Sequence, residues 1–505
     1  MEAYPVTLLQ RSDAGILMPA SVSFIPPQDV FHAMGEAGLE NELLVGNPDE
    51  LEEYWRQNSD SAWLLSHPGR SHVERDPRSC VGLRLWGDDA VATKQDSLYA
   101  LSVASVTTLH LTSLLSRILV FGITVGRFVN LEPLWRALTW ALEACLSGVM
   151  PSHDHLGEPL TGRRAANAGK RVCKSLHFLL SEFTGDLKFL VETLLLRFHH
   201  STSPEFCMKC FAVKTNGLLS GFNFNRDCGW QHLKRCHAEW MRDSGHMLAV
   251  AGLPGFHSLI VRFDLMHCLH LGILPVTLGS IFVELLSMNY WQGPCVGAWV
   301  YRWTIQLRTA FAEFRVWLSD NNICLSPPAF TVARLSLITK SGAPVFKGKA
   351  GMNMRVARWL LSVLSSLSQA SADPHHQAMT STLWGFIRGV DIFQSAGRFL
   401  NPSELLELEV ARKAAFVAHA TLAHNAISRG SQLWRTLPKA HYVDHIYRCE
   451  DLLNPTCGWT FSDEDWIGRL IRINRRSADG DKLVRKYLLR FHMVLDKHQL
   501  SAPQL

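Results

Sequence analysis

The sequence predicts an α/β protein in which a mixed sheet with covering helices is followed by a large helical region. Before residue 205, short runs of apolar residues alternate with polar ones and end at glycines and acids, which is typical of strands. After about residue 205, apolar residues recur at the spacing of helices. The chain has 505 residues, is 47% hydrophobic and contains 16 Trp and 25 Phe. It can therefore bury a large core, and more than one.

The elements are expected in the following order. A helix opens near residue 48, and the first strand, "CVGLRLWGDD", ends at a glycine and two acids. The helical region is broken at segments that contain Pro, such as "SADPHH" and "LNPSE". The expected strands are 80–89, 97–106, 117–125 and 174–186, and the expected helices are 48–57, 131–149, 187–200, 272–288, 297–319, 351–369, 377–389 and 402–428.

Composition and local sequence argue against a disulfide-rich, a secreted or a membrane-spanning protein. The 12 cysteines lack the dense, regular spacing of a disulfide scaffold, which favours free thiols and leaves room for a metal site. The N-terminus does not have the pattern of a signal peptide, so we expect an intracellular protein. The apolar stretches 111–129 and 272–286 contain charged residues, which favours buried core over membrane spans.

Acidic residues stand at the ends of three separate elements. They are Asp88 (or Asp89), Asp186 and the "SDED" cluster at 462–465. A site for two magnesium ions needs carboxylates that converge from different elements, because hard cations take oxygen ligands and keep positions open for phosphate and water. The alternative is that these acids only cap turns and helix N-termini. The residues alone leave both interpretations open.

A Cys-x-x-C pair, Cys207 and Cys210, follows the expected helix 187–200. A redox pair would stand at a strand-to-helix junction, so this position favours a zinc site. Two further ligands are expected from His267 and His270. Rival ligands are Cys228, Cys236 and His237, and uncoordinated buried thiols are the alternative to any metal site.

Four blocks resemble, in the same order, segments of transposases of the CACTA (En/Spm) and Plavaka type. They are "LWGDDAVATKQDSLYALSVAS" at 85–105, "TGDLKFLVETLLLRFHHSTSPEFCMKC" at 184–210, "FDLMHCLHLGILPVTLGSIFVELL" at 263–286 and "GWTFSDEDWIGRLIRI" at 458–473. The resemblance implies an RNase H-like mixed sheet flanked by helices and interrupted by a large all-α insertion. The implied domains are a lead-in at 1–75, the first part of the core at 76–205, a zinc-loop and helical insertion at 206–440, and the rest of the core at 441–505.

The resemblance also implies roles for individual residues. Asp88, Asp186 and Glu464 take the places of the three catalytic acids, although only helix phase can choose between Glu464 and its neighbours Asp463 and Asp465. The Asp-x-x-His pair, Asp264 and His267, is implied to lie near the active site, where a capping Asp with a hydrogen-bonded His is the alternative. The implied cofactor is Mg²⁺ or Mn²⁺, beside a structural Zn²⁺.

Basic residues gather near the C-terminus, although the net charge of the whole chain is only +5. Spacings of three and four residues place several of them on one helical face, where they could neutralise phosphates. A solvated charged face is the alternative, and the resemblance favours contact with DNA. The expected DNA-binding residues are Arg472, Arg475, Arg476, Arg485 and Lys486.

Two functions from different classes follow. The first is DNA strand cleavage and strand transfer by a two-metal mechanism. The protein would then be nuclear and would act on the DNA ends of a transposable element. A homo-oligomer is one of the assembly states that the sequence leaves open. The second is a catalytically inactive transposase derivative that serves as a DNA-binding or scaffold protein. An unrelated helical protein with a structural zinc is a third interpretation.

Overall fold

The computed structural model describes residues 2–12, 15–91, 97–124, 128, 130–196, 203–215, 217–225, 228–243, 249–475 and 483–489. The chain divides into two compact units. The sheet unit comprises Met1–Arg197, Cys236–Arg262 and Thr460–Leu505. The helical unit comprises Phe198–Arg235 and Phe263–Trp459.

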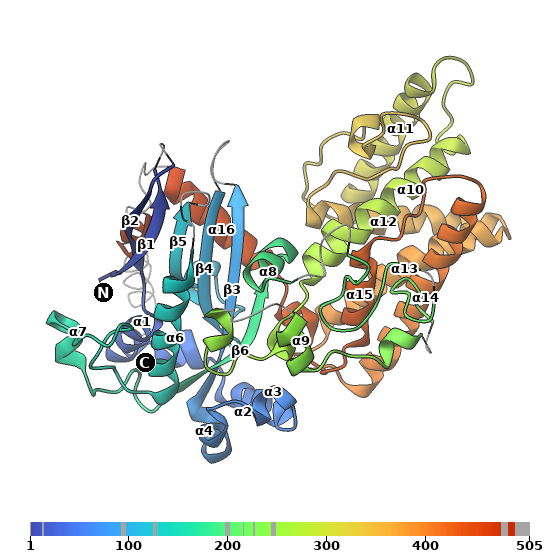
Figure 1. Cartoon of the computed structure of the whole chain (residues 1–505). Helices are drawn as coiled ribbons and strands as arrows, with labels where there is room; N and C mark the ends of the chain where they lie inside the picture. The colour runs from blue at the N-terminus through green and yellow to red at the C-terminus, as the bar shows by residue number, and fades with distance from the viewer. Residues whose placement is uncertain are drawn as a thin grey trace. The chain divides into compact units, whose positions relative to one another are not determined.

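A four-stranded mixed sheet forms the centre of the sheet unit (Figure 1). Its order is β5-β4-β3-β6; β3 and β4 pair antiparallel, as do β4 and β5, whereas β6 runs parallel to β3. The strands are β3 (Cys80–Val91), β4 (Ser97–Ser105), β5 (Ile118–Thr124) and β6 (His177–Gly185). The mixed α/β class and the four expected strands are confirmed.

Helices and loops cover the sheet, so its strands are largely buried. All nine residues of β6 are buried, as expected for a strand that is covered on both faces. Helix α6 (Glu132–Ser147) packs near β6, begins with a Pro in its first turn and ends at Gly148, whose φ of 70° is in the left-handed region. Beyond β6, Val261 forms a short parallel bridge with Phe183.

Helix α16 (Phe461–Arg475) packs against the central strand β3. The ring centroids of Trp86 and Trp466 lie 5.8 Å apart in an edge-to-face arrangement. Arg117, next to the start of β5, donates to Asp463 over 2.8 Å, and both side chains are buried. These contacts attach a C-terminal helix to strands that precede it by more than 300 residues.

The first 75 residues are more ordered than the expected lead-in. Strands β1 (Tyr4–Arg11) and β2 (Leu17–Phe24) form an antiparallel hairpin, with Val6, Leu8 and Phe24 buried. Helix α1 (Pro27–Glu36) follows and packs against α6. The shorter helices of the sheet unit are α2 (Pro48–Asn58), α3 (Ala62–Leu65), α4 (Arg70–Arg75), α5 (Ser113–Ser116), α7 (Gly162–Asn167), α8 (Leu187–Thr193) and α9 (His237–Asp243).

The helical unit contains the long helices that the sequence predicts. Its core includes a cluster of aromatic rings from Phe282, Phe314, Phe330 and Trp359. The helices are α10 (Leu274–Ser287), α11 (Trp299–Asp320), α12 (Ala350–Ala370), α13 (Pro374–Ser395), α14 (Pro402–Ser428) and α15 (Pro438–Arg448).

One helical stretch, Met266–Ser287, is long and apolar enough to cross a membrane by length and composition alone. Within its most apolar window, 89% of the residues are buried inside the fold. Such burial is expected of a core helix in the helical unit.

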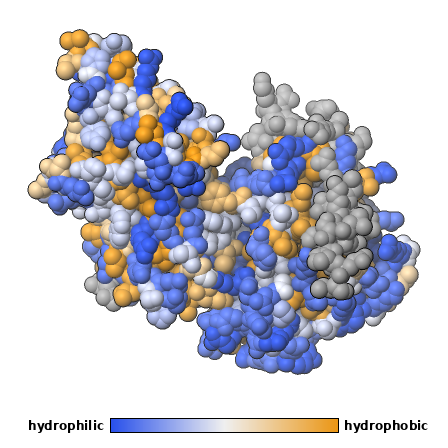
Figure 2. Space-filling view, turned by 180° about the vertical axis from the view of Figure 1, so that it is seen from behind, coloured by the Kyte–Doolittle hydropathy of each residue, from blue (hydrophilic) through white to orange (hydrophobic). Residues whose placement is uncertain are grey.

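The division into units differs from the expected domains at three places, because the helical unit begins at Phe198 and two further segments change unit. Cys236–Arg262 belongs to the sheet unit, because Val261 and Arg262 bond to Phe183 of β6. Residues 441–459 belong to the helical unit, because α15 packs against α14. On the face drawn in Figure 2, hydrophilic residues cover most of the described surface and hydrophobic ones lie scattered among them.

We expect Gly87→Ala to destabilise the sheet unit. A Cβ at Gly87 would lie 2.1 Å from the Phe189 ring of α8, so the strand or the helix must shift at a cost of about 1–3 kcal/mol or more. Thermal unfolding followed by circular dichroism should show a lower midpoint. The matched control is Gly468→Ala in α16, where a Cβ meets no atom within 4 Å and Ala should stabilise the helix by about 0.5–1 kcal/mol. An equal midpoint for Gly87→Ala and the parent chain would contradict this packing.

Candidate metal centre and acidic site

The first two acids follow a pair of residues that lie in register. Gly87 of β3 pairs with Gly185 of β6 in the parallel ladder, and Asp88 and Asp186 come directly after them. Neighbouring strands lie about 4.8 Å apart. The fold therefore brings Asp88 and Asp186 to the same level of adjacent strands, although 98 residues separate them in the chain.

The two faces of β3 have different neighbours. The Cβ position of Gly87 points at Phe189 of α8, and Asp89 accepts a hydrogen bond from Lys188 of the same helix over 2.5 Å. Because side chains alternate along a strand, Trp86 and Asp88 point to the opposite face, where Trp466 of α16 packs on Trp86. Asp88, and not Asp89, is thus the acid on the face that carries α16.

The three acids at the start of α16 differ in their surroundings. Asp463 is buried in the ion pair with Arg117. Asp465 accepts hydrogen bonds from Ser113 and Arg469 over 2.8 Å each. Glu464 lies between them and is half-buried. The choice of Glu464 as the third acid rests on the resemblance, and its neighbours Asp463 and Asp465 stay alternatives.

The carboxylates of Asp88, Asp186 and Glu464 do not form a group of ligands within 4.8 Å of one another. Asp186 instead caps α8, since its side chain accepts from the backbone N–H of Phe189 over 2.6 Å. This is the capping role that the sequence left open. In this arrangement, a bound Mg²⁺ or Mn²⁺ is not supported by side-chain geometry.

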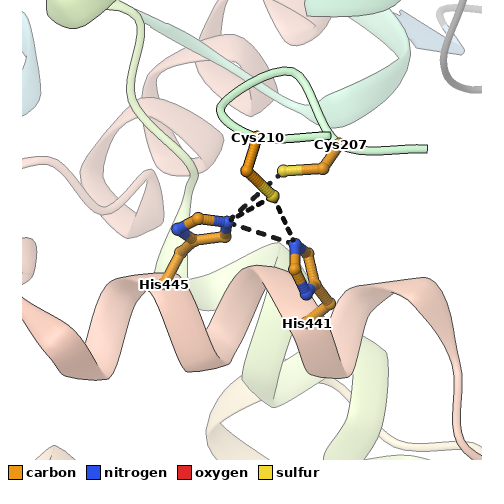
Figure 3. Close-up of side chains that lie close together, drawn as sticks. All are labelled: Cys207, Cys210, His441 and His445. Atoms are coloured by element: carbon orange, nitrogen blue, oxygen red, sulfur yellow. Dashed lines mark hydrogen bonds between the residues drawn. The ribbon is translucent and has the colours of Figure 1, made fainter. Parts of the chain in front are cut away.

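A second group of potential ligands lies in the helical unit and is compact (Figure 3). Cys207, Cys210, His441 and His445 are all buried, and their ligand atoms all lie within 4.8 Å of one another. The thiols come from the loop after residue 203, and the two imidazoles project from successive turns of α15 (Figure 3). This cluster could bind a metal such as zinc.

Four separations within the cluster are close to, or slightly shorter than, the edges of a tetrahedron around zinc. The Nε2 atom of His445 lies 3.4 Å from both sulfurs and 3.1 Å from Nε2 of His441, which in turn lies 3.3 Å from the sulfur of Cys210. Zn–S bonds of about 2.3 Å and Zn–N bonds of about 2.0–2.1 Å give tetrahedral edges of roughly 3.3–3.8 Å. Small outward movements would admit one ion with four protein ligands.

The pKa values of the two thiols in the cluster shift in opposite directions. Burial alone would raise the pKa of the Cys207 thiol, but a hydrogen bond with Cys210 and the charges of His445 and His441 lower that pKa well below its ordinary value. Burial lowers the pKa of His445 to about 4, so its imidazole is neutral near pH 7. Burial, and then the hydrogen bond and charge of Cys207, raise the pKa of Cys210, so the metal-free cluster favours one thiolate, one thiol and a neutral His445 imidazole. Zinc binding needs both thiolates and would release the remaining thiol proton.

Groups around the ligands hold them in place. The carbonyl of Gly221 lies 3.0 Å from Nδ1 of His441, so it can accept the proton of that nitrogen and leave Nε2 free to bind metal. The backbone N–H of Lys209 donates to the sulfur of Cys207 over 3.3 Å. The Trp230 ring packs on both imidazoles, at centroid distances of 4.3 and 4.9 Å. Four protein ligands in an enclosed, largely apolar shell are typical of a structural zinc site.

The expected ligands His267 and His270 lie outside this cluster and are corrected to His441 and His445. Asp264 caps the turn that follows it: its carboxylate accepts from the backbone and from Nδ1 of His267, over 2.9 and 2.5 Å. His270 is buried against Trp459, and burial lowers its pKa to about 4. The capping alternative therefore describes the local geometry of Asp264 and His267.

The rival ligands also have other positions. Cys228 accepts a hydrogen bond from Gln231 over 3.0 Å. Cys236 and His237 belong to the sheet unit, where the His237 ring stacks on that of His257 at 4.1 Å. The His-x-x-x-His spacing of "HYVDH" at 441–445 was the sequence signal for the missing ligands, because it places two imidazoles on one helical face.

The expected DNA-binding residues are described in part. Arg472 and Arg485 are exposed, and Lys486 is half-buried. The side chain of Arg475 and the whole of Arg476 lie outside the described residues. Residues 483–489 are helical and pack against β5, since the hydroxyl of Tyr487 donates to the carbonyl of Arg117 and accepts from the N–H of Leu119.

Comparison with known proteins gives no relative: no protein-family model matches the sequence, and no curated protein matches it.

We expect the purified chain to carry about one equivalent of zinc, and Cys210→Ser or His441→Ala to lose most of it, because each removes one of four ligands. Metal content measured by mass spectrometry checks this, and thermal unfolding should show a lower midpoint for both variants. The matched control is Cys228→Ser, which changes a buried thiol of the same segment that lies outside the cluster. Absence of zinc from the parent chain, together with rapid labelling of Cys207 and Cys210 by a thiol reagent, would refute the site.

Proposed function

We propose that the sheet unit is a metal-dependent module for DNA strand cleavage and transfer, built as an RNase H-like fold of the transposase type. The observation that carries the proposal is the register of β3 and β6, which aligns Asp88 and Asp186. In RNase H-like folds the acids come from the first strand, the fourth strand and a late helix. Here β3 and β6 are the first and fourth strands of the sheet, and α16 is the late helix.

Asp88, Asp186 and Glu464 are the residues that would hold Mg²⁺ or Mn²⁺. The chemistry supplied by the bound ions is activation of a water or a DNA 3′-hydroxyl and stabilisation of the leaving oxygen. Asp88 contributes a carboxylate that is only 6% exposed, on the strand that α16 covers. Asp186 must turn from its capping contact with Phe189 toward Asp88 when it binds a cation. The exposed Arg472 and Arg485 would lie against the phosphate backbone.

The zinc centre serves stability in this proposal. It joins the loop that carries Cys207 and Cys210 to α15, at positions more than 230 residues apart in the chain. The helical unit corresponds to the all-α insertion of the resemblance. Its zinc would be present before any DNA is bound, because all four ligands are supplied by the chain itself.

A second candidate function is that of an inactive derivative that binds DNA or acts as a scaffold. The capping role of Asp186 and the spread of the three carboxylates favour it. The two candidates make opposite predictions for cleavage and the same prediction for DNA binding.

If the first candidate is correct, the parent chain nicks supercoiled plasmid DNA in Mn²⁺ or Mg²⁺, and Asp88→Asn and Asp186→Asn each reduce the rate by about 100-fold or more. Both changes remove a carboxylate charge that the cations need. The matched control is Asp89→Asn, which removes the same charge from the other face of β3, where Lys188 pairs with it. Cleavage by the parent chain that both variants retain would refute the catalytic assignment, whereas DNA binding without cleavage would select the inactive derivative.

Substitution within the acidic cluster should separate chemistry from stability. We expect Glu464→Gln to abolish nicking with little change in the midpoint of thermal unfolding. Asp463→Asn should lower the midpoint, since loss of one partner from the buried pair with Arg117 costs about 3–5 kcal/mol. Asp465→Asn is the exposed control and should change both quantities little, because an amide oxygen can still accept from Ser113 and Arg469. Full nicking activity in Glu464→Gln would show that Glu464 is not the third catalytic acid.

A further inference from the structure

A cavity of about 640 Å³ lies in the helical unit, apart from the metal cluster. It is lined by residues from the end of α11 and from the facing sides of α12 and α13. Its chemistry is set by two tryptophans and three arginines, Trp317, Trp384, Arg355, Arg358 and Arg388. Asp391 is the acid among the lining residues, so the lining carries an excess of positive charge.

The two indoles offer flat surfaces for an aromatic ligand. Trp384 is 37% exposed. Trp317 is half-buried and stacks on Phe314, with ring centroids 6.2 Å apart and planes 15° apart. The contact with Phe314 therefore holds Trp317 in place. A planar group that stacks on Trp384 would cover apolar surface that is now in contact with water.

The arginines differ in how they are paired. Arg358 donates to Asp391 and Arg388 donates to Glu407. Arg355 is exposed and makes no hydrogen bond or ion pair with any residue that the structure describes. A guanidinium has five donors in a planar fork that matches phosphate. Arg355 can therefore take a phosphate without breaking an existing contact.

We propose that this cavity binds one nucleotide of single-stranded DNA, with its base stacked on Trp384 and its phosphate at Arg355. Stacking on exposed aromatic rings beside basic side chains is the general mode by which proteins hold single strands. The choice of DNA as the polynucleotide rests on the proposed function. The site itself rests on the cavity and its residues.

The end of α11 favours a strand over a free nucleoside triphosphate. Trp317, Asn321 and Ile323 line the cavity at the C-terminal end of that helix. The aligned peptide dipoles of α11 give this end a partial negative charge, which disfavours a dense polyphosphate. One phosphate of a chain, with its neighbours in solvent, avoids this repulsion.

The test is fluorescence anisotropy of a labelled 20-nucleotide oligothymidine with the full chain, in buffer that contains no magnesium, manganese or chelator. Under these conditions binding is measured without cleavage and without removal of zinc. We expect Trp384→Ala to weaken binding by about tenfold, since a base–aromatic stack contributes about 1–3 kcal/mol. Arg355→Ala should weaken binding several-fold and reduce the slope of log K against log salt by about 0.7.

The controls are Trp299→Ala and Arg308→Ala, which make the same chemical changes on α11 outside the cavity. Both should bind like the parent chain. Oligothymidine binding by a parent chain that does not nick plasmid DNA would support this proposal while the proposed cleavage fails, so the two outcomes are told apart. Parent-level binding by Trp384→Ala and Arg355→Ala would overturn the proposal. So would the absence of oligothymidine binding in the parent chain, including a result in which only free thymidine monophosphate binds.

Discussion

The parallel pairing of β3 with β6 is the constraint on which the rest of the sheet unit depends. At the level of Gly87 and Gly185, the ring of Phe189 lies so close to both backbones that no Cβ fits at either position. The first turn of α8 can thus begin at Asp186, immediately after β6 ends. The same close packing places Asp88 beside Asp186, turns Asp89 toward Lys188, and leaves the opposite face of β3 for α16.

The Cys/His cluster is the corresponding constraint in the helical unit. The described residues of 203–235 form few regular elements, so most of this segment lacks the cooperative hydrogen bonds of helices and strands. It is attached to α14 and α15 by polar groups as well as by the cluster: buried Arg412 donates to Asp444 of α15 and to the carbonyl of Phe224. A buried pair of this kind adds little stability by itself but is costly to break. A zinc ion would stabilise the segment more strongly, because its binding free energy becomes folding free energy.

Much of the architecture could be predicted from the sequence, for a physical reason. Strands such as 80–89 and helices such as 351–369 bury one face or both, so their apolar patterns are strong. The hairpin at 4–24 was missed because the alternation of apolar and polar residues in each strand is short, and neither strand was recognised as the pairing partner of the other. The extents of the two units were missed at 236–262 and 441–459, because the bonds that assign these segments are long-range and have no local pattern.

Two of the four candidate metal ligands could be predicted from the sequence. Cys207 and Cys210 are close in sequence, and their spacing is itself the signal. The histidines were taken from "DLMHCLH", where Asp264 satisfies the turn locally, whereas "HYVDH" has the spacing of any amphipathic helix. For the acids, the resemblance named candidates, and the register of the strands shows that Asp88 and Asp186 follow paired residues of β3 and β6. The cavity between α11, α12 and α13 has no signal in the sequence, because its residues come from three helices.

The central claim is that Asp88 and Asp186 bind a catalytic cation together. A crystal structure of the full chain grown with Mn²⁺, with anomalous scattering recorded near the manganese edge, tests this most directly. We expect a manganese peak bonded to carboxylate oxygens of both Asp88 and Asp186, with Asp186 turned away from the N–H of Phe189. Saturating Mn²⁺ that leaves Asp186 in its capping position, with no peak between the two carboxylates, would contradict it.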